Sequence, residues 1–182
     1  MARKIYVISG PSCSGKGYLS YLLLKKCPEL QTTTSYTSRE RRAEEREGVD
    51  YYFISPEKFT EMINSGDFFE YDEHPKGSGK FYGTSNSEIE KDGKILLELN
   101  SNGAKSIKKK FPDAVLIFIT ADIEKIKERM ISTKNRNEVE KRLEVAEREI
   151  KEAPSIYDYI IPNNEEDATL AVNKLVEIVE GE

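Results

Sequence analysis

The strongest constraint on the fold lies near the N-terminus, where a short apolar run meets a glycine-rich segment and then a leucine-rich one. Residues 4–9 predict a buried strand. The segment Gly10-Pro-Ser-Cys-Ser-Gly-Lys16 follows at once, with the spacing of a phosphate-binding P-loop. The leucines after it predict the apolar side of a helix: Leu19, Leu22, Leu23 and Leu24. A strand that enters a helix through such a loop indicates a parallel α/β core.

This loop predicts the binding of a polyphosphate. Successive backbone N–H groups and the helix N-terminus can surround phosphate oxygens, and Lys16 adds a mobile positive charge. The alternative is a glycine-rich turn with an incidental lysine, which the flanking strand and helix disfavour. The residues expected to contact the nucleotide are Pro11, Ser12, Cys13, Ser14, Gly15, Lys16, Gly17 and Tyr18.

One position departs from the motif. The residue after the lysine is ordinarily Ser or Thr, whose hydroxyl meets Mg²⁺, but here it is Gly17, followed by Tyr18. A tyrosine reaches too far to replace a threonine hydroxyl. We therefore expect the metal to rely more on phosphate oxygens, water and other side chains.

Composition narrows the class of protein. The chain has 182 residues, near the size of one domain, and a formal net charge of −5 disfavours nonspecific nucleic-acid binding. No apolar run is long enough to cross a membrane. Cys13, Cys27 and the single His74 cannot supply a four-ligand metal site. A disulfide between the cysteines is possible in principle, but reduced thiols in a cytoplasmic protein are the simpler interpretation.

The rest of the chain alternates between strand and helix patterns, with an exposed charged loop at residues 39–50. Further strands are expected at 32–38, 51–54, 68–71, 81–84, 95–99, 114–119 and 159–161. Helices are expected at 56–66, 87–91, 104–110, 122–130 and 137–151, with a terminal helix after residue 164. This order predicts an α/β protein, in which a parallel sheet core flanked by helices carries a mixed α/β insertion.

Three polar residues are expected to cap helices. Asp122 precedes one helix, and Asn137 with Glu140 resembles a capping box for the next. Asn164 is expected to cap the terminal helix. The residues expected on the inner side of that helix are Leu170, Leu175, Val176 and Val179.

A second constellation follows the first helix and extends through the chain. Its first part comprises Ser35, Arg39, Arg42, Glu45, Gly48 and Tyr51-Tyr-Phe53. Further matching segments are 66–70, 81–85, 142–149 and 157–163. Together these residues resemble the guanylate kinase family over essentially the whole chain. The resemblance implies a P-loop nucleoside monophosphate kinase fold in a single domain 1–182. It divides this domain into a core (1–34, 86–128 and 143–182), a GMP-binding region (35–85) and a short lid (about 129–142).

The resemblance also implies an activity. A guanylate kinase transfers the γ-phosphoryl group of ATP to GMP, and we expect dGMP to serve too, giving ADP and GDP in purine nucleotide metabolism and GMP recycling. Mg²⁺ accompanies the ATP. ATP and GMP are then the partners, with no nucleic acid and no membrane. The oligomeric state is left open between monomer and homodimer.

The expected acceptor site has a phosphate end and a base end. Arginine suits a phosphate because its planar guanidinium forms two parallel hydrogen bonds. The resemblance assigns Arg39, Arg42, Glu45 and the hydroxyls of Ser35, Tyr51 and Tyr82 to the GMP-binding set. Guanine offers N1–H and an amine as donors, so a carboxylate suits it; Glu70 matches that role and Thr84 the O6/N7 edge.

A second departure from the family stands at Glu98-Leu-Asn100, where Asp-x-Asp is usual. Glu98 keeps the negative charge and can position Mg²⁺ through water. Asn100 keeps a carbonyl for the guanine amine but loses the charge. Weaker guanine binding or a broader acceptor range is the resulting hypothesis.

The transfer step itself needs cations rather than a base, because the acceptor phosphate is already ionised. The resemblance assigns catalytic roles to Lys16, Arg39, Arg129 and Arg142. Residues 132–137 would form the lid, and either Lys134 or Arg136 takes the place of the usual lid arginine.

Two other functions were weighed. A relative acting on another phosphorylated acceptor, such as a ribose bisphosphate, is disfavoured by Glu70 together with Thr84. A non-catalytic module that binds a phosphorylated protein segment would be expected to lose Lys16 or the lid arginines, which are present.

Overall fold

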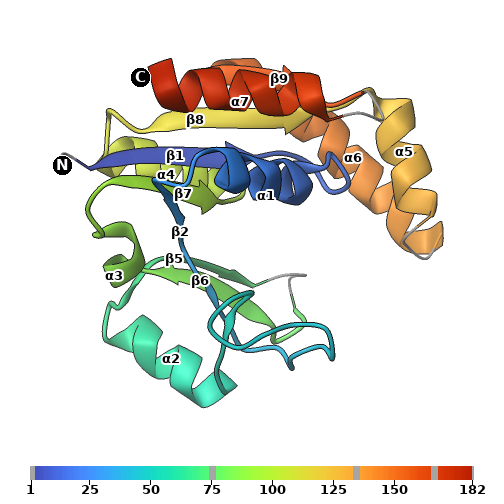
Figure 1. Cartoon of the computed structure of the whole chain (residues 1–182). Coiled ribbons are helices and arrows are strands. Elements are labelled where there is room, and N and C mark those ends of the chain that lie inside the picture. Colours follow the sequence, from blue (N-terminus) through green and yellow to red (C-terminus); the bar gives the residue numbers. More distant parts are fainter. Residues whose placement is uncertain (1–2, 74–76, 133–135, 165–167, 182) are drawn as a thin grey trace. The chain divides into compact units, whose positions relative to one another are not determined.

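The computed structural model describes residues 3–73, 77–132, 136–164 and 168–181 (Figure 1). The chain divides into two units, which are described separately. The core unit comprises Lys4–Gln31 and Leu96–Glu182, and the insertion unit comprises Thr32–Ile95. No helix among the described residues combines the length and the apolar character that a membrane span requires.

The core unit is built on a sheet in which β1, β8 and β9 run parallel, with β1 pairing Ile8 to Ile117 and β8 pairing Ile119 to Ile161. The strand order is β2-β7-β1-β8-β9. The strands are β1 (Lys4–Ser9), β2 (Leu30–Thr32), β7 (Lys94–Glu98), β8 (Val115–Thr120) and β9 (Tyr159–Pro162). The central strands are apolar on both faces, as expected for a sheet covered by helices on each side.

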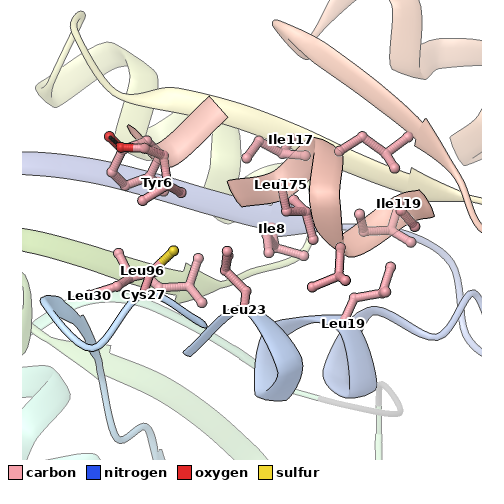
Figure 2. Close-up of a cluster of buried hydrophobic side chains, with 14 of the residues drawn as sticks. Tyr6, Ile8, Leu19, Leu23, Cys27, Leu30, Leu96, Ile117, Ile119 and Leu175 are labelled. Carbon is pink, nitrogen blue, oxygen red and sulfur yellow. Dashed lines mark hydrogen bonds between the residues drawn. The ribbon is translucent and has the colours of Figure 1, made fainter. Parts of the chain in front are cut away.

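The helices of the core unit are α1 (Lys16–Lys26), α4 (Ser101–Lys110), α5 (Ile123–Ile131), α6 (Arg136–Glu152) and α7 (Thr169–Gly181), with a short 3₁₀ turn, η1, at Ala153–Ser155. Helices α1 and α7 pack together and cover one apolar cluster. Figure 2 shows this cluster, which includes Tyr6, Ile8, Leu19, Leu23, Cys27, Leu30, Leu96, Ile117, Ile119 and Leu175. Because Leu23 is fully buried there, Leu23→Ala would cost about 2–5 kcal/mol of stability.

The insertion unit holds a mixed sheet of order β4-β3-β6-β5. Strands β3 and β4 run parallel, whereas β6 is antiparallel to both β3 and β5. The elements are β3 (Tyr36–Thr37), β4 (Tyr52–Phe53), α2 (Pro56–Asn64), β5 (Phe68–Glu73), β6 (Phe81–Ser85) and α3 (Asn86–Ile89).

Aromatic packing fixes α2 on this sheet. Pro56 opens the helix and the hydroxyl of Ser55 accepts from the backbone N–H of Lys58 at 3.2 Å, so the N-terminus is capped. The fully buried ring of Phe59 stacks on Phe68 at 4.4 Å between centroids. The base-binding candidates on β5 and β6 therefore stand on a packed support.

The α/β fold class is confirmed, but the strand predicted at 32–38 is wrong as one element. Strand β2 ends at Thr32, and β3 begins at Tyr36 in the other sheet. The backbone N–H of Thr34 donates to the Glu88 carboxylate at 2.9 Å instead of to a strand. The ladder is interrupted there, and hydroxyl-rich, β-branched composition alone does not reveal the interruption.

Asp122 is the N-cap residue of α5, as predicted, although its side chain makes no capping hydrogen bond. The predicted cap of α7 is wrong. Asn164 does not cap α7, which begins at Thr169; its side-chain oxygen accepts from the backbone N–H of Asp122 at 2.7 Å. Leu170 is 67% exposed rather than inward-facing, and the buried face of α7 carries Ala171, Val172, Leu175 and Val179.

The capping box predicted at Asn137 is wrong because α6 already includes Arg136. Asn137 is therefore inside the helix rather than at its cap. Cys13 and Cys27 are not joined by a disulfide. Cys27 is buried in the core, and Cys13 packs against a second apolar cluster formed by residues of α5 and α6.

Candidate functional site

The loop between β1 and α1 lies tightly against the ends of β8 and β9. Gly10 has φ 153°, and a Cβ there would lie 2.2 Å from the carbonyl oxygen of Ile119. Gly15 has φ 89°, and a Cβ there would lie 2.3 Å from the side-chain amide nitrogen of Asn163. The two glycines of the motif are therefore required by close approach as well as by backbone conformation.

The side chain of Asn163 holds this loop in place. It is 7% exposed, and its Nδ2 donates to the carbonyl oxygen of Ser14 at 2.9 Å. In a trans peptide the C=O and the following N–H point in opposite directions. Fixing the Ser14 carbonyl toward Asn163 therefore directs the N–H of Gly15 to the other side of the loop, where a phosphate oxygen can accept it.

Arg129 of α5 is tied to the same two segments. Its guanidinium donates to the carbonyl oxygen of Asn163 at 3.0 Å and to that of Cys13 at 3.4 Å. The backbone N–H of Asn163 in turn donates to the carbonyl oxygen of Thr120, at the end of β8, at 2.7 Å. A cation expected in the transfer step is thus anchored beside the phosphate loop of the core unit.

Lys16 and Arg142 also belong to the core unit. Lys16 is the first residue of α1 and is partly exposed. Burial raises the pKa of Glu149 on α6, while the nearby positive charge of Lys16 opposes that rise. Arg142, the buried Ala146 and Glu149 are spaced to lie on one face of α6. Lys16 therefore lies close to the part of α6 that carries Glu149.

Residues 133–135 of the predicted lid, Lys134 among them, lie outside the described residues, and Arg136 begins α6. The choice between the two stays a prediction.

The position after Lys16 has room for a side chain. The nearest atom to a Cβ built at Gly17 is the Oε2 of Glu98, at 3.9 Å, which is ordinary van der Waals contact. Glu98 is exposed at the end of β7. Tyr18 is 59% exposed, so its hydroxyl does not replace the missing one near the loop. The described residues contain no group of three or more His, Cys, Asp or Glu side chains that would hold a metal ion.

In the insertion unit, Arg39 is held by a ring of polar and aromatic groups. Its NH1 and NH2 donate to the two carboxylate oxygens of Glu45 at 2.7 and 2.5 Å, and its Nε donates to the hydroxyl of Tyr82 at 3.2 Å. The guanidinium lies 5.3 Å from the ring centre of Tyr51 and 5.6 Å from that of Phe53. Its side chain is only 9% exposed, so its orientation is set before any ligand binds.

The ion pair has clear electrostatic consequences. Two hydrogen bonds from Arg39, with another from the backbone N–H of Arg42 at 2.9 Å, lower the pKa of Glu45 to about 2. The hydrogen bond to Glu45 also raises the pKa of Arg39. Both groups are charged at neutral pH. Arg42 is exposed, so its side chain is accessible to an anion.

The base-end candidates lie on paired strands. Glu70 pairs with Thr84 in the β5–β6 register, and the Thr84 hydroxyl donates to the Glu70 carboxylate at 2.8 Å. The hydroxyls of Ser35 and Thr84 are 3.4 Å apart. Burial raises the pKa of Glu70, against the opposing effect of the hydrogen bond from Thr84. A partly buried carboxylate of this kind is stabilised by a ligand that brings donors.

The two ends of this site share one face of β6. Tyr82 and Thr84 are two residues apart, so their side chains lie on the same side of the strand, about 7 Å apart along it. Tyr82 contacts Arg39, and Thr84 contacts Glu70. Strand β6 therefore sets the separation between a fixed cation and a buried carboxylate.

Asn100 has a structural use in the core unit. Its side-chain oxygen accepts from the backbone N–H of Gly103 at 2.9 Å and caps α4. An aspartate would cap the helix in the same way. The residue expected to meet guanine is thus held in place by its own helix.

Two contributors were not assigned from the sequence. Asn163 stands at the end of the last predicted strand, and a polar residue at that edge was the available signal. Phe53 was noted only as part of a motif, although its ring lies against Arg39. Neither contact has a local sequence signature.

Comparison with known proteins gives a consistent result. The sequence profile described as guanylate kinase matches residues 2–182. The guanylate kinase of Clostridioides difficile strain 630 is 39% identical over 98% of this chain and 87% of its own length. That of Fusobacterium nucleatum is 38% identical over 97% of this chain and 95% of its own length. The crystal structure of guanylate kinase from Anaplasma phagocytophilum superposes with a TM-score of 0.76 at 27% identity, covering 99% of this chain and 86% of that one.

Proposed function

The chain belongs to the guanylate kinase family, and from that premise we propose how its residues divide the work of moving the γ-phosphoryl group of ATP to GMP. The enzyme is a nucleoside monophosphate kinase, and its products are ADP and GDP. We extend the acceptors to dGMP, because none of the groups considered below addresses the 2′-hydroxyl.

On the donor side, the loop from Pro11 to Tyr18 holds the phosphates of ATP. Backbone N–H groups and the N-terminus of α1 face the phosphates, and the mobile side chain of Lys16 binds their negatively charged oxygens. The contacts of Asn163 with Ser14 support this role because they fix the direction of the loop peptides. Mg²⁺ is the proposed cofactor, and the residues present fit a metal that is held mostly by phosphate oxygens and water and that the exposed carboxylate of Glu98 positions through water.

On the acceptor side, Arg39 and Arg42 bind the GMP phosphate, assisted by the hydroxyls of Ser35, Tyr51 and Tyr82. Glu45 serves this site by holding Arg39 from behind, since a carboxylate of low pKa would repel a phosphate. The rings of Tyr51 and Phe53 beside the guanidinium help to hold Arg39 in this orientation.

At the base end, Glu70 accepts from N1–H and the amine of guanine, and Thr84 serves the O6/N7 edge. Adenine offers no such donor pair, so it would leave the partly buried Glu70 carboxylate with the Thr84 hydroxyl as a donor but none from the base. Asn100 contributes its amide to the same recognition. Asn100→Asp should tighten GMP binding while preserving the cap of α4; unchanged kinetic constants for every base would exclude this role for Asn100.

In the transfer step, Lys16, Arg39, Arg129 and Arg142 neutralise the charge that accumulates between the phosphates. Arg129 is anchored to backbone carbonyls at both the loop and β9, which supports a positioning role for its charge. No side chain needs to act as a base. Either Lys134 or Arg136 completes the set from the lid at about 129–142.

The observation that carries this assignment is the shared face of β6, where Tyr82 holds the phosphate-binding Arg39 and Thr84 holds the base-binding Glu70. It is tested by measuring ADP formation from ATP with GMP, dGMP, AMP, UMP and a ribose bisphosphate. GMP and dGMP should be used, with kcat/KM for AMP lower by at least about 10²-fold. Preference for the ribose bisphosphate would overturn the base assignment. Binding of a phosphopeptide without turnover of any acceptor would favour the interaction module.

We also propose that residues 1–34, 86–128 and 143–182 act as the core, and 35–85 as the GMP-binding region. Two cysteines that are not joined by a disulfide fit a cytoplasmic protein.

A further inference from the structure

Two departures from the usual motifs lie next to each other in the core unit. Gly17 removes the hydroxyl that ordinarily follows the P-loop lysine. Glu98, at the end of β7, carries its carboxylate on a side chain one methylene longer than the usual aspartate. The Oε2 of Glu98 lies 3.9 Å from a Cβ built at Gly17, so the carboxylate borders the space that a Ser or Thr side chain would fill.

Glu98 has no other evident task. It is exposed, and among the described residues no hydrogen bond or ion pair engages its carboxylate. By contrast, the exposed Glu61 pairs with Lys58 at 2.9 Å. The nearby Asn100 caps α4, and Ser9, on the neighbouring strand β1, donates to the carbonyl oxygen of Leu99. Asn100 and Ser9, near the end of β7, thus form hydrogen bonds within the fold, whereas the longer side chain of Glu98 does not.

The metal-binding chemistry available here matches this arrangement. Mg²⁺ in nucleotide sites is typically held by one or two carboxylates together with substrate phosphates, rather than by a cage of protein ligands. The absence of any three-ligand cluster among the described residues agrees with that pattern. A carboxylate oxygen is also a stronger ligand for a hard dication than the neutral hydroxyl that it would replace.

We propose that Glu98 stands in for the missing hydroxyl: its longer side chain brings a carboxylate to the space beside Gly17, where it binds the Mg²⁺ of the ATP complex directly. Glu98 and Gly17 thus form a matched pair, in which the length of one side chain compensates for the absence of the other. The inference rests on the proposed function, because it assumes that the loop holds metal-bound ATP. It goes further in naming one ligand and the reason for its length.

The test measures binding rather than turnover. The dissociation constant of a non-hydrolysable ATP analogue is determined by calorimetry on the full chain, once with Mg²⁺ and once with EDTA. The dissociation constant in EDTA divided by that in Mg²⁺ is the metal-dependent gain. Because the coupling between metal and nucleotide is reciprocal, this ratio also gives the factor by which the protein raises the affinity of the bound nucleotide for Mg²⁺. Glu98→Gln should reduce this ratio by about tenfold or more, the usual effect of removing a metal-site partner, and should not weaken binding in EDTA.

Length is separated from charge by two further variants. Glu98→Asp keeps the charge but should lose the metal-dependent gain as Glu98→Gln does. Adding Gly17→Ser to Glu98→Asp recreates the ordinary pair and should restore the gain. The matched control is Glu177→Gln, which changes an exposed glutamate on α7 and should leave the ratio unchanged.

Three results would overturn the proposal. They are a ratio unchanged in Glu98→Gln, a ratio near wild type in Glu98→Asp, and failure of Gly17→Ser to restore the gain. Thermal unfolding of each variant excludes misfolding, and the exposure of Glu98 predicts little change. Phosphorylation of GMP by the wild type is measured separately. If the wild type turns over GMP while Glu98→Gln keeps its ratio, only this inference fails; if the wild type does not turn over GMP, the proposed function fails.

Discussion

Replacing Asn163 by alanine should weaken both the fold and the binding of ATP, and the structure sets the size of each effect. The side chain makes one hydrogen bond to the phosphate loop, from Nδ2 to the carbonyl oxygen of Ser14 at 2.9 Å, at a site that is 7% exposed. Asn163→Ala leaves that buried carbonyl without its partner, which costs about 1–3 kcal/mol. For a domain of this size the melting temperature should fall by about 2–12 °C.

The effect on nucleotide binding follows from the peptide geometry of the loop. Once the Ser14 carbonyl is no longer fixed, the N–H of Gly15 loses its set direction. The loss of one charge-assisted hydrogen bond, about 1.5 kcal/mol, corresponds to roughly tenfold weaker binding of ADP. Affinity for GMP should change little. Arg39 and Arg42, which we propose bind its phosphate, and Glu70, which we propose binds its base, all lie in the insertion unit.

The assay combines thermal unfolding with calorimetric titration of ADP and of GMP. Asn164→Ala is the matched control: the side chain of this neighbouring asparagine also bonds to a backbone group, but it accepts from the N–H of Asp122 rather than donating to the carbonyl of Ser14. It should lose less stability and keep its affinity for ADP. Equal affinity of Asn163→Ala and wild type for ADP would refute the positioning role, as would equal losses in the two asparagine variants.

A coupled substitution checks the packing behind this reasoning. Gly15→Ala places a Cβ 2.3 Å from Nδ2 of Asn163 and also requires an L-residue at φ 89°. In an Asn163→Ala background the collision disappears, whereas the backbone strain stays. Gly15→Ala should therefore destabilise the double variant less than it destabilises the wild type, and simple additivity of the two losses would contradict the close approach.

Three further predictions concern the acceptor residues. Glu70→Gln should lower kcat/KM for GMP by about 10²-fold or more in steady-state assays, because an amide presents a donor to guanine's donors. Burial raises the pKa of Glu70. As pH falls through that pKa, the ligand-free wild type should therefore gain stability relative to Glu70→Gln, while the affinity of the wild type for GMP falls. Stability and affinity that change in parallel with pH in the two proteins would contradict this. Arg39→Lys should lower kcat/KM for GMP by about tenfold or more through loss of the paired hydrogen bonds, whereas the control Arg46→Lys, 74% exposed, should change little. The pKa of Glu45 is lowered from 4.5 to about 2. The stability that its ion pair gives to the fold is therefore complete above pH 4.5 and is lost as pH falls toward 2. In acid titrations the difference in stability between wild type and Glu45→Gln should shrink over that range.

The elements that the sequence predicted well are those set by local pattern. Strand β1 matches its prediction at both ends, because its apolar run is bounded by the glycine-rich loop. Helix α2 follows from Pro56 and the Ser55 cap. Where long-range hydrogen bonds compete, local pattern fails: Asn164 has the composition of a helix cap, but its side chain is bonded to a backbone group 42 residues away in sequence.

The same distinction applies to the candidate site. The charges of residues 39–50 by themselves indicated an exposed loop, and the resemblance to guanylate kinases assigned Arg39 to the acceptor phosphate. Its burial against Tyr51 and Phe53 was not predictable, because a run with several acids and bases allows many pairings and only the fold selects Glu45. Asn163 could not be assigned for a related reason: its partner Ser14 is 149 residues away.

The departures at Gly17 and Glu98 show what a motif specifies. The Ser or Thr that ordinarily follows the P-loop lysine provides an oxygen near the metal. The chain can supply that oxygen from any element whose side chain reaches the metal. Here the Oε2 of Glu98, at the end of β7, lies 3.9 Å from a Cβ built at Gly17, so a longer acid on β7 can meet the requirement that α1 no longer meets. A motif with one missing residue is therefore weak reason to infer lost metal binding until the neighbouring strand end has been inspected. The prediction that follows is specific to the pair: single changes at either position alter the metal-dependent gain, and the matched exchange of both conserves it.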